Sequence, residues 1–287
     1  MKIIGIGELV WDLLPSGPQL GGAPVNFAFF AKELGAEAFP ITAIGRDALG
    51  EEALGILREA GLDTSLIQLN GFPTGTVKVS LDAAGIPSYD ITRDTAWDNI
   101  ACPQEALEIV RGADAVCWGS LAQRSPVSRT SILALVDAAP SSCKKVFDIN
   151  LRQDYYSADL LEDSLRRADI LKLNEDELPV LKGLFGLPAE DAEAIDALIR
   201  RFSLEMVIHT CGAVGSSVYT AEGPVSRLDT PKVEVADTVG AGDSFTAAFV
   251  TALLGGSPVA EAHALAIRIS AYVCTRPGAI NSPTAGK

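Results

Sequence analysis

A short glycine-rich turn near the end of the chain carries the residues best suited to chemistry. Gly240-Ala241-Gly242 stands directly before Asp243, and an apolar stretch with helical spacing follows from Phe245. Glycines let a backbone approach a ligand closely, and the unpaired amides of a first helical turn attract anionic oxygens. A carboxylate beside such amides is kept ionised and is able to take a proton from a hydroxyl group. The pattern suits phosphoryl transfer, and the simpler alternative is a glycine turn in which Asp243 only caps the helix.

Three further stretches combine glycines or amides with polar side chains. They are Gly21-Gly22-Ala23-Pro24-Val25-Asn26 before a helical pattern, and Asn174-Glu175-Asp176-Glu177 and Thr210-Cys211-Gly212-Ala213-Val214-Gly215, each after an apolar strand pattern. Ligands of open α/β sheets bind beyond the carboxyl ends of the strands, so the last two stretches are well placed for a binding site.

The chain between these motifs alternates short apolar runs with amphipathic stretches. We expect strands at Ile3–Ile6, Phe39–Ile44, Ala115–Trp118, Lys145–Asp148, Ile170–Leu173, Met206–His209 and Ser217–Tyr219. We expect helices at Pro24–Leu34, Asp47–Ala60, Gln104–Arg111, Pro126–Ala138, Leu160–Ala168, Asp191–Phe202, Ala241–Leu254 and Val259–Cys274. Regular alternation predicts an α/β fold with a doubly wound, mostly parallel sheet covered on both faces by helices.

One segment departs from this alternation. Thr76–Leu81 alternates polar and apolar residues, Asp82–Gly85 has the composition of a turn, and Ser88–Thr92 follows, so an antiparallel hairpin is predicted. Glu8–Leu14 is available to pair with it, which would make a small β lid of residues 9–15 and 72–95, beside an α/β domain of residues 1–8, 16–71 and 96–287. The lid's apolar face (Val77, Val79 and Leu81) either closes over the chain's own ligand or pairs with a second subunit in a homodimer.

The composition narrows the class of protein. Hydrophobic residues make up 48% of the 287 residues, enough for a large core, and no apolar run reaches the roughly 18 residues that span a bilayer. The net charge of −14 disfavours a nucleic-acid partner. The N-terminal residues resemble a first strand and not a signal peptide, and the five widely spaced cysteines are typical of free thiols, so we expect a cytoplasmic protein.

The four motifs resemble those of the ribokinase-like (PfkB-type) carbohydrate kinases and follow one another along the chain in the family's order. The resemblance spans essentially the whole chain. Asp237–Asp243 is similar to the family's C-terminal motif, Gly21–Asn26 to its GGxxxN motif, Asn174–Glu177 to its NxxE motif and Thr210–Gly215 to its TxGxxG loop. The GGAP form of the second motif is most like fructokinases. The resemblance implies an ATP-dependent phosphotransferase that acts on an alcohol group of a sugar.

The resemblance also assigns roles to individual residues. For catalysis it implies Asp243 as the base, with Gly240, Ala241 and Gly242 as the anion hole. For the sugar it implies Asp12, Gly21, Gly22 and Asn26, with Arg152 of the segment Asp148–Arg152 near a phosphate or the sugar. For the nucleotide it implies Asn174, Thr210, Gly212 and Gly215, with Glu177 holding Mg²⁺ through water. Asp237, with backbone carbonyls around residues 274–279, is implied as a K⁺ site.

Several alternatives stay open. D-Fructose is favoured as the acceptor because Gly119–Arg124 and Ala96-Trp97-Asp98 also look like fructokinases, while ribose, 2-keto-3-deoxygluconate and a nucleoside are the rivals. Ile267 stands where many relatives have an Asn that contacts the nucleotide. Trp97 and Trp118 belong either near the sugar or in the core. A non-catalytic sugar-binding regulator is the rival from another class; a dinucleotide-binding enzyme is disfavoured because Val10 replaces the third glycine, and no GxxxxGK[ST] sequence is present.

Overall fold

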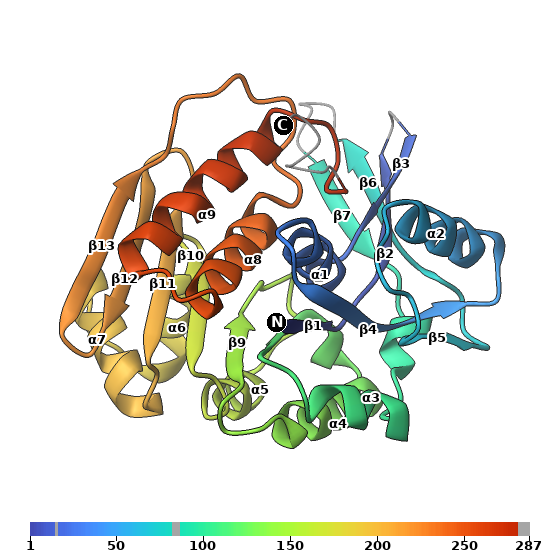
Figure 1. Ribbon diagram of the computed structural model, residues 1–287, viewed down its shortest axis with the longest axis horizontal. Coiled ribbons are helices and arrows are strands. Elements are labelled where there is room, and N and C mark those ends of the chain that lie inside the picture. The colour runs from blue at the N-terminus through green and yellow to red at the C-terminus, as the bar shows by residue number, and fades with distance from the viewer. Residues whose placement is uncertain (15–16, 82–86, 281–287) are drawn as a thin grey trace.

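Two β-sheets form the framework of the molecule (Figure 1). The computed structural model describes residues 1–14, 17–81 and 87–280. The larger sheet has nine strands in the order β13-β12-β11-β10-β9-β8-β1-β4-β5. Its strands are β1 (Lys2–Ile6), β4 (Glu37–Gly45), β5 (Ile67–Asn70), β8 (Ala115–Trp118), β9 (Lys144–Asp148), β10 (Ile170–Asn174), β11 (Met206–Cys211), β12 (Gly215–Thr220) and β13 (Gly223–Asp229).

The larger sheet is mostly parallel, as predicted. Every pair from β5 to β11 is parallel, and β12 and β13 extend the sheet at one edge through two antiparallel pairs, β11 with β12 and β12 with β13. The predicted strand at Ser217–Tyr219 lies in β12, so it does not continue the parallel alternation. Strands β5 and β13 were not predicted; they lie at the two edges of the sheet, where few of their side chains are buried and the hydrophobic pattern is weak.

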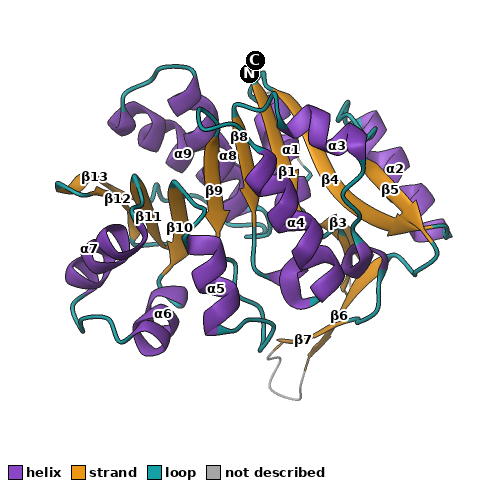
Figure 2. Cartoon of the chain, turned by 90° about the horizontal axis from the view of Figure 1, so that it is seen from below, coloured by secondary structure: helices purple, strands orange, loops and turns teal. Residues whose placement is uncertain are grey.

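Helices cover both faces of this sheet (Figure 2). They are α1 (Ala23–Glu33), α2 (Ala48–Glu59), α3 (Gln104–Val110), α4 (Pro126–Ala138), α5 (Ala158–Leu165), α6 (Glu177–Phe185), α7 (Asp191–Phe202), α8 (Ala241–Leu254) and α9 (Val259–Cys274). Helices α1, α2, α8 and α9 share one apolar cluster and α3 to α7 share the other.

Successive residues of each strand supply the two clusters in turn. Ile3, Val146 and Ile170 pack against α1, α8 and α9, while Phe147 and Leu171 pack on the opposite face. This is the period-two geometry of a strand buried on both sides. The α/β doubly wound prediction is therefore confirmed. No helix in the described ranges is long and apolar enough to cross a membrane, and all five cysteines are free thiols, two of them buried.

The smaller sheet has four strands in the order β3-β2-β6-β7: β2 (Val10–Leu14), β3 (Gly17–Gly21), β6 (Gly75–Leu81) and β7 (Pro87–Ile91). The predicted hairpin is β6 with β7, and β2 pairs with it as expected, in parallel register, while the β2–β3 and β6–β7 pairs are antiparallel. Strand β3 was not predicted, because the sequence analysis placed its residues in the larger domain.

The apolar face of the hairpin is only partly visible. Val77 is buried and packs in the chain's own core with Ile91. The side chains of Val79 and Leu81 lie outside the described part of the structure, and so does the predicted turn at residues 82–85.

Arg124 connects the residue that follows β7 of the smaller sheet with Trp97 and Asp98. Arg124 lies 4.0 Å from the centre of the Trp97 ring, pairs with Asp98 at 2.8 Å, and donates to the Thr92 carbonyl just after β7. A planar guanidinium suits this combination of stacking and two-point pairing. Trp97 and Trp118 are fully buried and lie in the apolar core, the second of the two positions that the sequence left open.

Candidate active site

The site is built around the first turn of α8. Gly240 adopts a left-handed conformation with φ of 78°, and a Cβ placed on it would lie 2.9 Å from the Cβ of Ala279. The amide of Ala241 donates to the Thr238 carbonyl at 3.2 Å. Within the part of the chain that the structure describes, the amides of Gly242 and Asp243 donate to no protein acceptor. Two unpaired donors at the positive end of a 14-residue helix are suited to an anionic oxygen.

Asp243 lies beside these amides and contacts the N-terminal half of the chain. The Asn26 side chain, on α1, donates from Nδ2 to Asp243 Oδ2 at 2.8 Å, although the two residues are 217 positions apart. Asn26 is buried, and none of the described residues donates a hydrogen bond to its Oδ1. An orphaned acceptor in a buried amide is costly unless a ligand satisfies it. The structure therefore brings together the predicted base and a predicted sugar-binding residue.

Gly21, Gly22 and Asp12 lie where β2 and β3 meet the start of α1. A Cβ on Gly21 would lie 3.1 Å from Asp12 Oδ2, and one on Gly22 would lie 2.4 Å from the Glu8 carbonyl oxygen. Gly22 also has a φ of 118°, which side chains rarely tolerate. Glycine is required here because helix α1 starts directly against the backbone that follows β1.

Three carboxyl groups share this end of the site. Burial raises the pKa of Glu8 to about 7 and the pKa values of Asp12 and Asp243 to about 6. The charge of Arg152 lowers the pKa of all three, so this exposed arginine lies within electrostatic reach of the site. Glu8 Oε2, like Asn26 Oδ1, is buried and has no hydrogen-bond partner within residues 1–14, 17–81 and 87–280.

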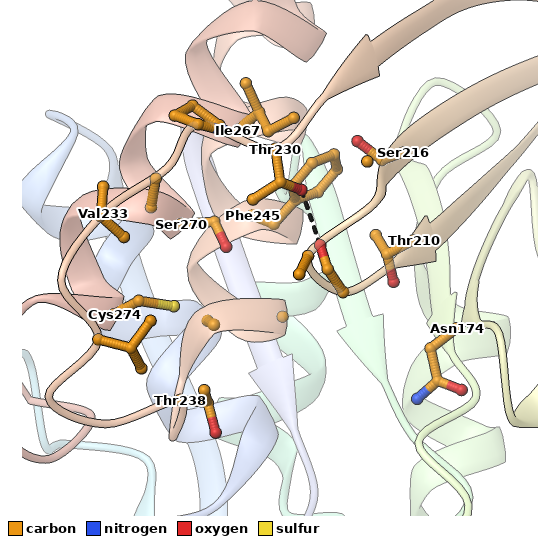
Figure 3. Close-up of a pocket in the computed structure, with 18 of the residues that line it drawn as sticks. Asn174, Thr210, Ser216, Thr230, Val233, Thr238, Phe245, Ile267, Ser270 and Cys274 are labelled. Carbon is orange, nitrogen blue, oxygen red and sulfur yellow. Dashed lines mark hydrogen bonds between the residues drawn. The ribbon is translucent and has the colours of Figure 1, made fainter.

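A cavity of about 680 Å³ opens beside Ala241 and Gly242 at the start of α8 (Figure 3). It lies between the start of α8 and the carboxyl ends of β10 and β11, and its lining includes Asn174, Thr210, Gly212, Gly215, Ala241, Gly242 and Ile267. A Cβ on Gly215 would lie 2.4 Å from the Leu228 carbonyl, and Gly212 has a φ of 45°, so both glycines shape the loop. Val233, Val235, Phe245 and Ile267 make the far end of the cavity apolar.

Comparison with known proteins identifies the family of this chain. The family model described as pfkB family carbohydrate kinase matches residues 18–285. The chain belongs to this family. It is 30% identical to a fructokinase from Klebsiella pneumoniae, over 98% of this chain and 95% of that protein. It is therefore a sugar kinase, a phosphotransferase that acts on a sugar hydroxyl.

Solved structures of relatives share the fold. A sugar kinase from Pyrococcus horikoshii is 27% identical with a TM-score of 0.84, covering 98% of this chain and 94% of that one, and it has also been solved in complex with ATP. An aminoimidazole riboside kinase from Salmonella enterica, at 22% identity and a TM-score of 0.82, covers 98% of this chain and 96% of that one. The second likeness shows the fold alone.

Asn174 and Glu177 of this kinase hold each other in place. Asn174 Oδ1 accepts the amides of Asp176 and Glu177 at 2.9 Å each, while Glu177 Oε2 accepts the Asn174 amide at 2.8 Å. Glu177 Oε1 accepts the Leu151 amide at 2.9 Å, and the side chain is buried, not solvated. Each carboxylate oxygen retains a second lone pair. The pair therefore fixes the end of β10, and each carboxylate oxygen can still accept one further hydrogen bond.

Asp237 is held against the end of α9. Its Oδ1 accepts the amides of Thr238 and Val239, and its Oδ2 accepts the Gly278 amide at 3.0 Å. The Cys274 carbonyl accepts the Ala236 amide at 2.8 Å. The structure thus brings together the two segments predicted to form a K⁺ site. Among the described residues no cluster of three or more His, Cys, Asp or Glu side chains is arranged to hold a metal.

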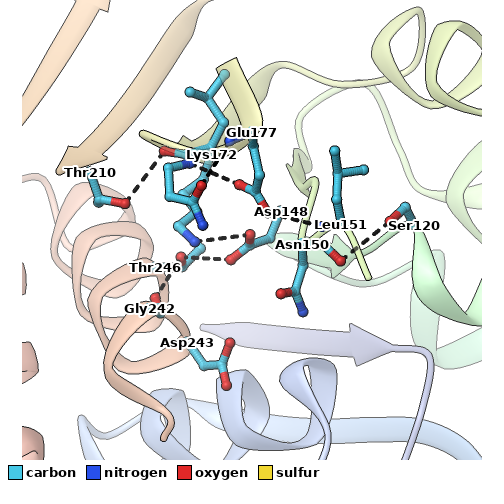
Figure 4. A network of polar contacts seen from close by, with 12 residues as sticks. Ser120, Asp148, Asn150, Leu151, Lys172, Glu177, Thr210, Gly242, Asp243 and Thr246 are labelled. Atoms are coloured by element: carbon cyan, nitrogen blue, oxygen red, sulfur yellow. Dashed lines mark hydrogen bonds and ion pairs between the residues drawn. The ribbon is translucent and has the colours of Figure 1, made fainter. Parts of the chain in front are cut away.

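Sequence reasoning missed Lys172 and Glu8 as site residues. Lys172 is 6% exposed and pairs with Asp148 at 3.2 Å within the network of Figure 4. Glu8 follows β1 and is 2% exposed. Each is a single charged residue in or just after an apolar strand. That was the available signal, since an ionised side chain is rarely buried without a partner or a function.

Proposed function

We propose that this kinase transfers the γ-phosphate of ATP to a primary hydroxyl of a sugar, D-fructose before other acceptors, and forms fructose 6-phosphate. The observation that carries the proposal is the 2.8 Å contact between Asn26 and Asp243. It joins the sugar motif of the N-terminal half to the base beside two free amides. A sugar held by Asn26 presents its hydroxyl next to Asp243.

The proposed step uses both oxygens of the Asp243 carboxylate. Oδ2 is held by Asn26, and Oδ1 receives no hydrogen bond from the described residues, so Oδ1 is available for the proton of the attacking hydroxyl. The hydroxyl oxygen forms a bond to the γ-phosphorus while the bond to the oxygen of the departing ADP breaks. The amides of Gly242 and Asp243 stabilise the negative charge on the transferring group.

The nucleotide fits the 680 Å³ cavity, which is in the size range of small-molecule sites. Its phosphates lie, in this proposal, along Asn174, Thr210 and Gly212, and its base reaches the apolar end near Ile267. Mg²⁺, held mainly through water near Glu177, neutralises charge on the phosphates when bound. A monovalent cation at Asp237 would steady the backbone that leads into the anion hole.

Fructose is proposed because the GGAP form of the Gly21–Asn26 motif looks like fructokinases and because the Klebsiella pneumoniae relative carries that name. Ribose, 2-keto-3-deoxygluconate and nucleosides are the rival acceptors. The Salmonella enterica riboside kinase shows that the same fold serves another acceptor.

A coupled assay of ADP release over a panel of sugars and nucleosides tests the proposal. We expect the highest kcat/KM with D-fructose and ATP, and loss of ADP release in the Asp243→Asn variant, which controls for contaminating kinases. A higher kcat/KM with another acceptor would replace fructose. Binding of sugar without turnover on any acceptor would instead indicate the non-catalytic regulator.

A further inference from the structure

Lys172 occupies the boundary between the nucleotide cavity and the base. It lies in β10, lines the cavity, and its Nζ is 3.1 Å from the place that a Cβ on Gly242 would take. The ammonium group is therefore next to the free amides at the start of α8. Figure 4 shows Lys172 and Asp148 between Gly242 and Glu177.

The hydrogen bonds of Lys172 are incomplete. An ammonium group has three donors, and Nζ donates to a single acceptor among the described residues, Asp148 Oδ1 at 3.2 Å. Asp148 is in turn oriented by the Thr246 hydroxyl, which lies 3.2 Å from Oδ2 and 3.0 Å from the Gly242 carbonyl. Two unused donors on a buried cation that faces a cavity point to an anionic ligand.

The surroundings keep this lysine charged. Burial lowers the pKa of Lys172, but the charges of Asp148, Glu177 and Asp243 outweigh it and raise the pKa above its ordinary value. Arg152, which the sequence offered as the cation of the site, is exposed to solvent. A charge acts more strongly where water is excluded, so the buried ammonium group is the better placed of the two.

We propose that Lys172 is a further catalytic residue, which donates hydrogen bonds to the phosphoryl group during transfer. The inference rests on the proposed function, because it assumes a phosphoryl group between Asp243 and the cavity. Asp148 acts as a positioning residue that aims the ammonium group. Hydrogen bonds from Lys172 should stabilise the transition state more than bound ATP, because negative charge on the phosphoryl oxygens is redistributed during transfer.

The test compares Lys172→Met with wild type in turnover and in binding. We expect kcat to fall by about 10²–10³-fold with little change in the sugar KM. Affinity for ADP, measured by calorimetry, should stay within about threefold, while affinity for ADP with aluminium fluoride and sugar, which imitates the transferring group, should fall by about the factor seen in kcat. Equal loss of both affinities would overturn the proposal in favour of a structural role. The exposed pair Lys144–Glu205 supplies the matched control, Lys144→Met, with wild-type values expected.

A double variant removes the ambiguity of folding. Lys172→Met alone leaves Asp148 buried without its partner and should lower the melting temperature. Lys172→Met with Asp148→Asn removes that unpaired charge, so its kcat should remain about 30-fold or more below that of Asp148→Asn alone. Recovery to the Asp148→Asn value would show that Lys172 serves only to neutralise Asp148. If wild type releases no ADP with any acceptor, the proposed function fails; if wild type is active and the double variant matches its control, only this inference fails.

Discussion

In the proposed function, the two halves of the site recognise their ligands by opposite means. The sugar half has the carboxyl groups of Glu8 and Asp12, and Asp243 lies where the two halves meet; burial raises the pKa values of these three groups to about 7, 6 and 6. The nucleotide half has backbone amides at a helix start and one buried ammonium group, Lys172. Carboxyl groups accept hydrogen bonds from sugar hydroxyls, whereas amides and an ammonium group donate hydrogen bonds to phosphate oxygens.

The difference shows how a chain of net charge −14 can handle a polyanion. Global charge repels ATP, but a helix N-terminus and a desolvated cation act locally, and salt screens distant charges. Asp243 lies at the boundary between the two halves, and both halves affect its pKa. Burial and the charge of Asp148 raise this pKa, whereas the hydrogen bond from Asn26 and the charge of Lys172 lower it. Each variant below removes one part of this contrast.

Replacing Asp243 by Asn should have the largest effect, because it removes the group that links the two halves. We expect kcat to fall by about 10²–10⁴-fold, with the melting temperature unchanged or higher, since a buried charge is lost. Steady-state kinetics and calorimetric melting measure the two quantities. Asp196→Asn, at an exposed pair on α7, is the matched control. Turnover close to wild type would remove Asp243 from the chemistry.

Replacing Asp12 by Ala should affect only the sugar half. Losing charge-assisted hydrogen bonds to hydroxyls should lower kcat/KM for the sugar by about 10–100-fold and leave the KM for ATP nearly unchanged. Varying each substrate in turn separates the two constants. An equal rise in both KM values would show that the halves are not independent.

Replacing Gly22 by Ala tests the close approach that forms the sugar half. The left-handed backbone and the 2.4 Å contact with the Glu8 carbonyl should cost about 2 kcal/mol or more in free energy of unfolding. Gly55→Ala, in α2 with open space around it, should instead stabilise by about 0.5–1 kcal/mol. Denaturant unfolding of both variants measures the difference, and similar values for the two would contradict the packing described.

Replacing Glu8 by Gln should change the pH dependence of stability. The folded-state pKa of about 7 lies above the ordinary 4.5, so the folded protein binds the proton more tightly and stability from this group is lost as pH rises from about 4.5 to 7. The variant should therefore gain about 1–3 kcal/mol relative to wild type across that range. The measurement is the free energy of unfolding of both proteins at pH 5 and at pH 8. If the difference between variant and wild type is the same at both pH values, the pKa of Glu8 is not raised by folding.

Most of the strands and helices and the four glycine or amide motifs were predictable because each combines a local pattern with turn residues, but strand β5 and helix α6 were not predicted. The strands β3 and β13 were not, since Gly17–Gly21 contains glycine and proline and no residue of Gly223–Asp229 is fully buried. Lys172 and Glu8 were not assigned because their meaning depends on which distant groups surround them. The single lysine of the apolar strand β10 can be assigned to the site only when the structure shows that it lies beside the start of α8.

A crystal structure with the sugar and a non-hydrolysable ATP analogue would test the central claim most directly. The account predicts the acceptor hydroxyl within hydrogen-bonding distance of Asp243 and Asn26, and the γ-phosphate at the amides of Gly242 and Asp243. A sugar bound away from Asp243, or a triphosphate that ends elsewhere in the cavity, would contradict it.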